Sequence, residues 1–238
     1  GNRTVNSQTL NDSWRSSEPS LSLDGSNDFV NIPHSSGVNF NRTTPFTLSV
    51  WVKSDPNPIN TTSSAIIEKW TGGGGYPFVI RMTPSGASKG QFQLAQYISG
   101  SGNAASVSTS STIEPYADSL DRWNHIVGIN TGTHLQIYLN GVKHDEIAVV
   151  SNDVDLSNDH AIGIGARNVA GSANYHHRGE IKDFRIHNRA MEADEVKGLY
   201  NGEATPWVYA DAGTELISNG DFSDTSSWTL HQGTDATT

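Results

Sequence analysis

The stretch Gly179-Glu-Ile-Lys-Asp-Phe-Arg-Ile-His-Asn-Arg-Ala-Met191 decides how this chain folds. Phe184 and Ile186 are apolar and have polar neighbours, which is typical of a strand with one buried face. Directly after it, apolar residues recur at helical spacing over residues 193–200, and Gly202 supplies a plausible C-cap. The stretch therefore predicts a closing strand followed by a short helix near Glu192 to Tyr200.

Upstream of this stretch, short segments also carry apolar side chains at every second position. They are Leu21/Leu23, Val30/Ile32, Leu48/Val50/Val52, Phe78/Ile80/Met82, Phe92/Leu94, Trp123/His125/Val127/Ile129 and Leu135/Ile137/Leu139. Many short strands joined by polar turns predict an all-β fold, namely a two-sheet antiparallel jelly-roll sandwich with one short peripheral helix over residues 20–207. The side chains expected in its core are Leu48, Val50, Trp123, Val127, Ile137, Leu139, Phe184 and Ile186.

The amino-acid sequences of these segments are similar to those of a known protein family. They include Pro45-Phe-Thr-Leu-Ser-Val-Trp51, Arg122-Trp-Asn-His-Ile-Val127 and Leu135-Gln-Ile-Tyr-Leu-Asn-Gly-Val-Lys143. Their order and spacing resemble the laminin-G-like jelly rolls of the concanavalin A-type lectin and glucanase superfamily. The resemblance implies the sandwich fold, but this fold hosts lectins, carbohydrate-binding modules, adhesion domains and glycanases alike.

The two ends of the chain differ from this pattern. Residues 1–19 are polar and end in Pro19, so we expect an arm or a linker. Residues 208–238 are expected to be a linker and the truncated start of a following module. Asn219-Gly-Asp-Phe222 and Trp228 resemble the opening strand of another family of β-sandwich carbohydrate-binding modules. The alternative is that this tail adds a strand to a neighbouring chain, because so few residues cannot bury a core alone.

Composition excludes several partners. The net charge of −10 argues against nucleic acid, whose phosphates require a basic face. No apolar run approaches the ~20 residues that span a bilayer, so we expect no membrane insertion. The chain has no cysteine, which excludes disulfides and favours a bacterial or viral exterior protein. We therefore expect an extracellular or virion-surface location.

Catalysis finds little support. Glycanases of the superfamily use carboxylates at alternate positions of one strand, because acid and nucleophile must face the cleft about 5 Å apart. The nearest match is Glu192-Ala-Asp194-Glu195, which lies in the predicted helix, where acidic groups suit the first turn. We therefore expect no enzyme.

The resemblance also implies one structural calcium ion between the first Asp-Gly turn and the closing strand. Its expected ligands are Asp24, Asp28 and Asp183, because Ca²⁺ binds carboxylate and carbonyl oxygens. The alternative reading is that Asp24-Gly25 and Asn27-Asp28 are turn formers without a metal. In related glucanases an acidic residue stands where this chain has Lys182. The second alternative is therefore that no calcium binds and that the Lys182 ammonium supplies the positive charge in place of the metal.

Glycan binding requires exposed aromatic planes together with amide and charged partners for hydroxyl groups. Two loops carry such groups. One holds the aromatic residues on either side of a run of four glycines, and the other is a Gly/Ser/Asn-rich loop before the closing strand. The candidate residues are Trp70, Tyr76, Arg167, Asn174, Tyr175, His176 and His177. The alternative is that Trp70 packs into the edge of the sandwich and that His176 and His177 face water without binding a ligand.

We therefore expect a non-catalytic glycan-binding or adhesion module of a modular extracellular or virion-surface protein, with cell-surface or extracellular glycans as partners. The alternative is a structural virion protein, either a capsid decoration or a tail-fibre domain, that uses the jelly roll to contact neighbouring modules or capsid and fibre subunits. A glycanase is the third alternative.

Overall fold

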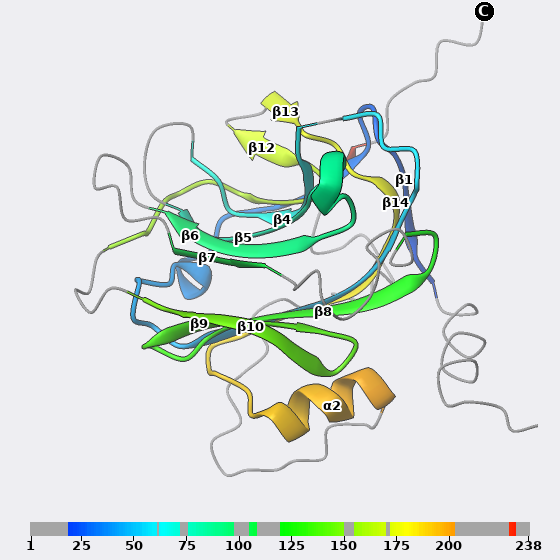
Figure 1. Ribbon diagram of the computed structural model, residues 1–238. Helices are drawn as coiled ribbons and strands as arrows, with labels where there is room; N and C mark the ends of the chain where they lie inside the picture. Colours follow the sequence, from blue (N-terminus) through cyan, green and yellow to red (C-terminus); the bar gives the residue numbers. More distant parts are fainter. Residues whose placement is uncertain are drawn as a thin grey trace, which may run out of the picture.

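Two antiparallel sheets face each other and enclose the hydrophobic core (Figure 1). The computed structural model describes residues 19–60, 62–71, 76–97, 105–108, 120–149, 155–169, 172–202 and 229–231. Sheet A has the order β1-β14-β3-β8-β9-β10 and sheet B the order β15-β2-β11-β4-β5-β6-β7, while β12 and β13 form a separate hairpin. The predicted all-β, two-sheet sandwich is confirmed.

The strands are short, as the alternation predicted. Their bounds are β1 Leu21–Asp24, β2 Phe29–Ile32, β3 Phe46–Ser54, β4 Ser64–Glu68, β5 Tyr76–Met82, β6 Phe92–Tyr97, β7 Ala105–Ser108, β8 Trp123–Asn130, β9 His134–Leu139, β10 Val142–Ala148, β11 Ile162–Ile164, β12 Arg167–Val169, β13 Ser172–Asn174, β14 Arg178–His187 and β15 Thr229–His231. Two 3-10 turns, η1 Ser36–Val38 and η2 Gly86–Ser88, lie between strands. The helix α2, Ala193–Asn201, has Glu192 as N-cap and Gly202 as left-handed C-cap, close to the predicted bounds.

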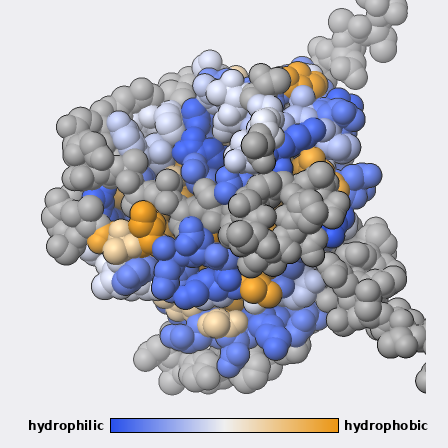
Figure 2. All heavy atoms as spheres, in the orientation of Figure 1, coloured by the Kyte–Doolittle hydropathy of each residue, from blue (hydrophilic) through white to orange (hydrophobic). Residues whose placement is uncertain are grey.

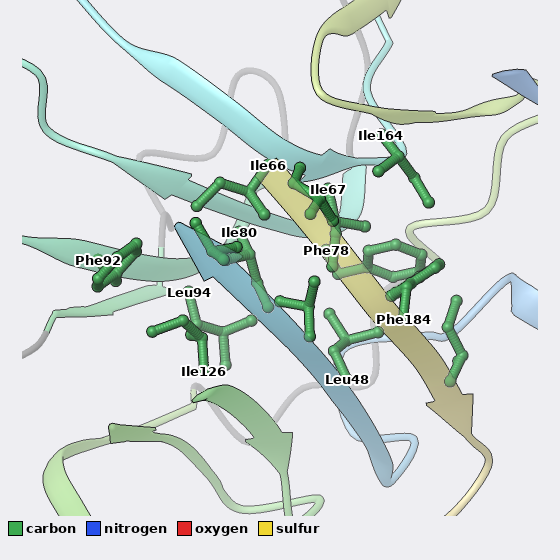
Figure 3. Close-up of a cluster of buried hydrophobic side chains, with 14 of the residues drawn as sticks. Leu48, Ile66, Ile67, Phe78, Ile80, Phe92, Leu94, Ile126, Ile164 and Phe184 are labelled. Atoms are coloured by element: carbon green, nitrogen blue, oxygen red, sulfur yellow. The ribbon is translucent and has the colours of Figure 1, made fainter. Parts of the chain in front are cut away.

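Side chains from the facing sides of both sheets fill the space between them (Figure 3). Leu48 and Phe184 come from sheet A, and Ile67, Phe78 and Ile80 come from sheet B; all five are fully buried. A one-sided apolar face on each strand can be removed from water only against another such face, so the alternating pattern leads directly to two packed sheets.

Strand β8 departs from the expected core. Ile126 is the residue that faces the sandwich interior, whereas Val127 and Ile129 lie on the outer side of sheet A in a second cluster with Val196 of α2. Val127 is therefore buried, as predicted, but beneath the helix. The prediction that Trp123 is a core residue is wrong, because its side chain is half-buried at the start of β8. Helix α2 covers part of this outer side (Figure 1).

Strand β14 contains an irregularity that strict alternation does not predict. Its register with β3 shifts between Lys182 and Arg185, and Asp183 has a left-handed φ of 50°. The extra residue places both Ile181 and Phe184 in the core, although three positions separate them. Lys182 consequently lies on the outer side of sheet A and not on the side of Phe184.

Two further strand pairings differ from the expectations. One lies in a segment expected to be a loop, and the other lies in the tail, which was expected to begin another module or to add a strand to a neighbouring chain. Residues 167–174 pair into the β12–β13 hairpin, with Arg167 opposite Asn174. In the tail, β15 pairs with β2 of the same chain, with Thr229 opposite Asn31. The described part of the tail therefore extends this chain's own sheet, and the rest of residues 203–238 lies outside the described residues.

The surface is mostly polar. Figure 2 shows hydrophobic residues in small patches among hydrophilic ones on one side of the molecule. Of the described residues, the exposed large hydrophobic side chains are Ile59, Val142 and Ile147. Two of these belong to β10, the edge strand of sheet A, whose side chains are nearly all exposed. No helix within the described ranges is long and apolar enough to cross a membrane.

Candidate functional site

The two loops predicted to bind glycan meet at Arg167. Its guanidinium carbon lies 3.6 Å from the ring centroid of Trp70 and 4.3 Å from that of Tyr175. Trp70 follows β4, and Tyr175 follows β13, so the fold brings together residues that are far apart in the sequence. Contacts this short between a guanidinium and aromatic faces are cation–π interactions.

Glu68, at the end of β4, holds Arg167 in place. Arg167 Nε donates to Oε2 of Glu68 at 2.6 Å, and Nη2 donates to Oε1 at 3.2 Å. This two-point contact fixes the guanidinium plane. Burial raises the pKa of Glu68, whose side chain is fully enclosed, while the hydrogen bonds from Arg167 oppose that rise. We name Glu68, Trp70, Tyr76, Arg167 and Tyr175 the Arg167 cluster.

The stack of rings continues across sheet B. Trp70 packs on Tyr76 with centroids 4.5 Å apart, and Tyr76 packs on Tyr97 with centroids 5.5 Å apart. Trp70 follows β4, whereas Tyr76 and Tyr97 belong to the neighbouring strands β5 and β6, and Arg167 stands on the β11 side of Trp70. Trp70 therefore has Arg167 against one face and Tyr76 against the other.

The position of each ring in the stack decides what it offers a ligand. Both faces of Trp70 and of Tyr76 are covered by neighbours, and Tyr76 is 5% exposed. Burial also raises the pKa of the Tyr76 hydroxyl. Tyr175 stands at one end of the stack and is half-buried. Tyr175 is therefore the ring at the end of the stack, and exposed Asn174 precedes it.

The remaining predicted residues have different surroundings. His176 is half-buried, with its ring edge-on to Phe29 at a centroid distance of 6.1 Å and its Nδ1 3.4 Å from the carbonyl oxygen of Asp28. His177 is fully buried and pairs through Nδ1 with the Ser64 hydroxyl at 2.7 Å, so it presents no surface to a ligand. Burial lowers the pKa of His177 to about 4. His177 is thus a core residue, contrary to its placement at a binding rim.

Sequence reasoning did not find two members of this arrangement, Glu68 and Tyr97. A signal for Glu68 was available, since it is an acidic residue that directly follows the apolar pair Ile66-Ile67. Tyr97 lies three positions after core residue Leu94, so it faces the other side of β6. The register shift in β5 between Tyr76 and Val79 likewise turns Tyr76 outward although Phe78 faces the core.

The expected calcium ligands are not all brought together. Asp24 and Asp28 belong to one turn, where Asp24 Oδ1 accepts from the Ser26 amide at 2.7 Å and Asp28 Oδ2 accepts from the Asp24 amide at 3.1 Å. Although partial burial acts to raise the pKa of Asp24, its backbone hydrogen bonds lower it overall. Asp24 is opposite Arg178 in the β1–β14 ladder. Arg178 and Asp183 are five residues apart on β14, so Asp183 lies roughly 16 Å along the strand from the position opposite Asp24.

Asp183 instead pairs with Arg185 Nε at 2.7 Å. Lys182 extends over the ring of Trp123, with its ammonium 4.4 Å from the ring centroid, and does not stand at the Asp24 turn. Within the described residues, no group of three or more acidic or histidine side chains is placed to hold a metal ion. The three predicted ligands therefore do not fit one shared ion, and calcium at the Asp24–Asp28 turn stays a prediction.

The carboxylates closest to a glycanase pattern lie at the start of α2, as predicted. Glu195 accepts two hydrogen bonds from Arg189, at 2.6 and 2.8 Å, and one from the Glu192 amide at 2.9 Å. These contacts give Glu195 a structural role in the helix cap.

The two packed antiparallel sheets form a β-jelly roll. A family model described as the concanavalin A-like lectin/glucanases superfamily matches residues 24–197, well over half of the chain. The chain belongs to this superfamily. A search of curated proteins found no sequence that matches the chain.

Solved structures with the same fold are distant in sequence. The binding domain of Paraclostridial Mosquitocidal Protein 1 has a TM-score of 0.59 and 19% identity over 77% of this chain and 43% of its own. The binding domain of botulinum neurotoxin serotype G has a TM-score of 0.56 and 19% identity over 76% and 41%. A protein from Bacteroides ovatus ATCC 8483, proposed to bind carbohydrate, has a TM-score of 0.56 and 16% identity over 86% and 54%. This chain thus spans about half or less of each, and the likeness is one of fold.

Proposed function

We propose that this chain is a non-catalytic glycan-binding or adhesion module that acts outside a cell or on a virion surface and contacts sugar through the Arg167 cluster. The observation that carries the proposal is the half-exposed ring of Tyr175, which lies against Arg167 and next to exposed Asn174. An aromatic face binds the apolar side of a sugar ring, and an amide binds its hydroxyl groups.

The surroundings of Tyr175 favour this use. Glu68 neutralises Arg167 and fixes it through two hydrogen bonds, and Trp70 packs on Arg167. Tyr175 is therefore supported by a rigid base, which reduces the ordering cost of binding. Because the charges of Glu68 and Arg167 cancel, the cluster is better suited to a hydroxyl-rich ligand than to a strongly charged one. The similar structures include two toxin binding domains and a protein proposed to bind carbohydrate, which agrees with a binding role.

A glycan array followed by calorimetry of the best ligand tests the proposal. Tyr175→Ala should weaken binding at least about tenfold with little change in Tm, because it removes the exposed ring and leaves the stack beneath it intact. Tyr175→Phe should retain most of the affinity. Both replacements keep a Cβ at the left-handed φ of 55°, so backbone strain is matched between them.

Trp70→Ala provides the contrast. Its ring contacts both Arg167 and Tyr76, so its loss should lower the free energy of unfolding by about 2–3 kcal/mol as well as weaken binding. Unchanged glycan affinity in Tyr175→Ala would remove the Arg167 cluster as the site. No glycan ligand, together with a fixed oligomer in native mass spectrometry, would favour the virion-assembly alternative.

A further inference from the structure

A cavity of about 300 Å³ opens at one end of sheet A, where β1 and β3 end and where β14 and β8 begin. Beside Leu23 and Gly179, its lining consists of polar and charged residues, namely Ser22, Lys53, Asp55, Asp121, Arg178 and Glu180. Ser22 is opposite Glu180 in the β1–β14 ladder, and Glu180 is opposite Lys53 in the β14–β3 ladder. The pairing of three strands therefore brings together side chains that are far apart in the sequence.

The charged groups of the lining lie on the outer side of sheet A. Ile181 and Val52, which are the chain neighbours of Glu180 and Lys53, belong to the core between the sheets. Because successive side chains of a strand point to opposite faces, Glu180 and Lys53 point away from the core. Their side chains are 35% and 33% exposed. A ligand can therefore reach them from solvent.

The carboxylates near Lys53 are loosely paired. The Lys53 ammonium lies 3.4 Å from Glu180 Oε1 and 3.7 Å from Asp121 Oδ1, and the second distance is too long for a hydrogen bond. Within the described part of the chain, no hydrogen bond reaches the Asp121 carboxylate, which is 74% exposed. Asp121 thus offers unused acceptor oxygens to an ammonium group.

Arg178 supplies the complementary cation on the other side of the cavity lining. Its Nε lies 3.1 Å from Asp55 Oδ2, and its Nη1 donates to the Asn57 carbonyl oxygen at 3.3 Å. A guanidinium has five N–H groups, so those of Nη2 stay available to an anionic oxygen. The planar fork of arginine matches the geometry of a carboxylate.

The acceptor and donor groups are close enough for one small molecule to contact both. Arg178 and Glu180 are two residues apart on β14, in regular register with β1, so their side chains share a face and lie roughly 7 Å apart along the strand. The ammonium and the carboxylate of an α-amino acid are attached to one carbon, and a hydrogen bond adds about 3 Å at each end. Such a molecule spans the distance between the two side chains.

The mixture of charges favours a ligand that carries both signs. The lining has three anionic and two cationic side chains. A lone carboxylate would meet three anionic groups, and a lone ammonium would meet two cationic groups. A zwitterion places an opposite charge against each kind of group, so both of its charges are attracted.

We propose that this cavity binds a free α-amino acid, with its ammonium between Asp121 and Glu180 and its carboxylate on Arg178. The volume is at the lower end of the range for ligand pockets, about 300–1,000 Å³, which favours a small molecule. Leu23 is 3% exposed and Gly179 has no side chain, so the lining offers little apolar surface to a large side chain. The expected ligands are therefore glycine, alanine and serine, and the inference is independent of the Arg167 cluster.

Isothermal titration calorimetry of the wild-type chain with these three amino acids tests the proposal. At least one should bind. Its methyl ester and its N-acetyl derivative should each bind at least about tenfold more weakly, because each lacks one of the two charges. Absence of binding by all three amino acids overturns the proposal. A methyl ester or an N-acetyl derivative that binds as tightly as its parent also overturns it.

Two replacements test the two ends of the ligand. Asp121→Asn should weaken amino-acid binding about tenfold at an almost unchanged Tm, because the side chain is exposed. Asparagine tolerates the left-handed φ of 56° at this position, so the backbone is preserved. Arg178→Gln should weaken binding by a similar factor. Unchanged affinity in either variant overturns the proposal, and the Tm of each variant reports whether it is folded.

The chain offers a matched control on the same sheet. Glu146 pairs with Lys143 at 3.0 Å on β10 and does not line the cavity, so Glu146→Gln should leave amino-acid binding unchanged. A loss equal to that of Asp121→Asn would mean that binding follows net charge, and it would overturn the proposal. Tyr175→Ala should also leave amino-acid binding unchanged, which separates this proposal from the glycan site. Loss of binding in Tyr175→Ala would place the amino acid at the Arg167 cluster and overturn the cavity as its site.

Discussion

His177 is a neutral imidazole enclosed by the protein. One ring nitrogen contacts Ser64, and the other has no hydrogen-bond partner. The unfolded chain binds a proton near pH 6.5, whereas the folded chain binds it near pH 4, because burial opposes the charge. The contribution of His177 to stability is therefore complete above pH 6.5 and is lost as the pH falls toward 4.

The expected loss over this range is about 3 kcal/mol in the free energy of unfolding. Urea unfolding of the wild type and of His177→Asn across this range measures it. The variant should show a shallower dependence on pH whatever its absolute stability. Parallel pH curves for the two proteins would show that His177 titrates normally in the folded chain.

A substitution at Phe184 tests the predicted core, also at the scale of a single residue. Its side chain is fully buried between the sheets, so Phe184→Ala should lower the free energy of unfolding by about 3–5 kcal/mol through lost burial and a cavity. Chemical denaturation gives the value. A loss below about 1 kcal/mol would place the ring outside the core.

Single residues were predictable where one side of a strand decides their burial. Phe184 and Leu48 followed from alternation, because each belongs to a strand with one face on the core. The burial of Trp123 could not be predicted in this way, because both sides of β8 carry apolar residues. Trp123 also begins the strand, and alternation does not show that the side chain at a strand end is partly exposed. His177 was placed wrongly because its partner, Ser64, is far away in the sequence.

At the scale of elements, the start of α2 depends on Glu195. Its carboxylate binds Arg189 and the Glu192 amide, and the hydrogen bonds from Arg189 lower its pKa. Glu195→Ala should lower the free energy of unfolding by about 2 kcal/mol, because a charged pair and a helix cap are lost together.

The exposed Asp194 in the same helical turn is the control, and Asp194→Ala should change stability by about 0.5 kcal/mol or less. The Glu195 carboxyl has a lowered pKa in the folded chain, so its contribution is present above pH 4.5 and is lost as the pH falls through the folded value. Thermal melts of both variants at neutral and acidic pH check that the contribution of Glu195 to stability decreases as the pH falls. Equal effects of the two replacements would remove the cap argument.

The strands and the helix were predictable as elements, but their irregularities were not. An uninterrupted alternation would place Lys182 on the side of Phe184. The suggestion that Lys182 replaces a metal charge came from the resemblance to glucanases, which have an acidic residue at this position. The bulge at Asp183 turns Lys182 to the outer side of sheet A. A single inserted residue reverses the faces of a strand, and the alternating pattern carries no mark of where the insertion lies.

At the scale of the whole molecule, the meeting of two loops at Arg167 was not predictable from one sequence. Both loops were identified from their aromatic and polar residues, but their distance depends on the order of the strands in sheet B. Alternation gives the faces of strands and not their neighbours. For this reason the fold class was accessible from the sequence, whereas the composition of the site required the structure.

Calcium binding is a further test on the whole molecule. If the Asp24–Asp28 turn binds Ca²⁺, an excess of one hundred times the dissociation constant should stabilise the chain by about 2.7 kcal/mol. A chelator should reverse the rise in Tm, and Asp24→Ala should abolish it. Asp183→Ala should leave it unchanged, since Asp183 pairs with Arg185 instead. A Tm that does not respond to calcium or chelator would leave Asp24 and Asp28 as turn formers.

The edge strand β10 has a consequence for solubility. Among the described strands, β10 pairs with β9 alone and so forms one rim of sheet A, where unpaired amide and carbonyl groups can capture a strand from another molecule. Exposed Val142 and Ile147 make this edge attractive to such a strand, whereas Lys143 and Glu146 between them oppose it, as does the register shift after Lys143. The double replacement Lys143→Val and Glu146→Val should therefore promote aggregation, seen by light scattering, at an almost unchanged Tm. On this prediction the two charges have a role in opposing edge-to-edge polymerisation, a task separate from any ligand that the molecule binds.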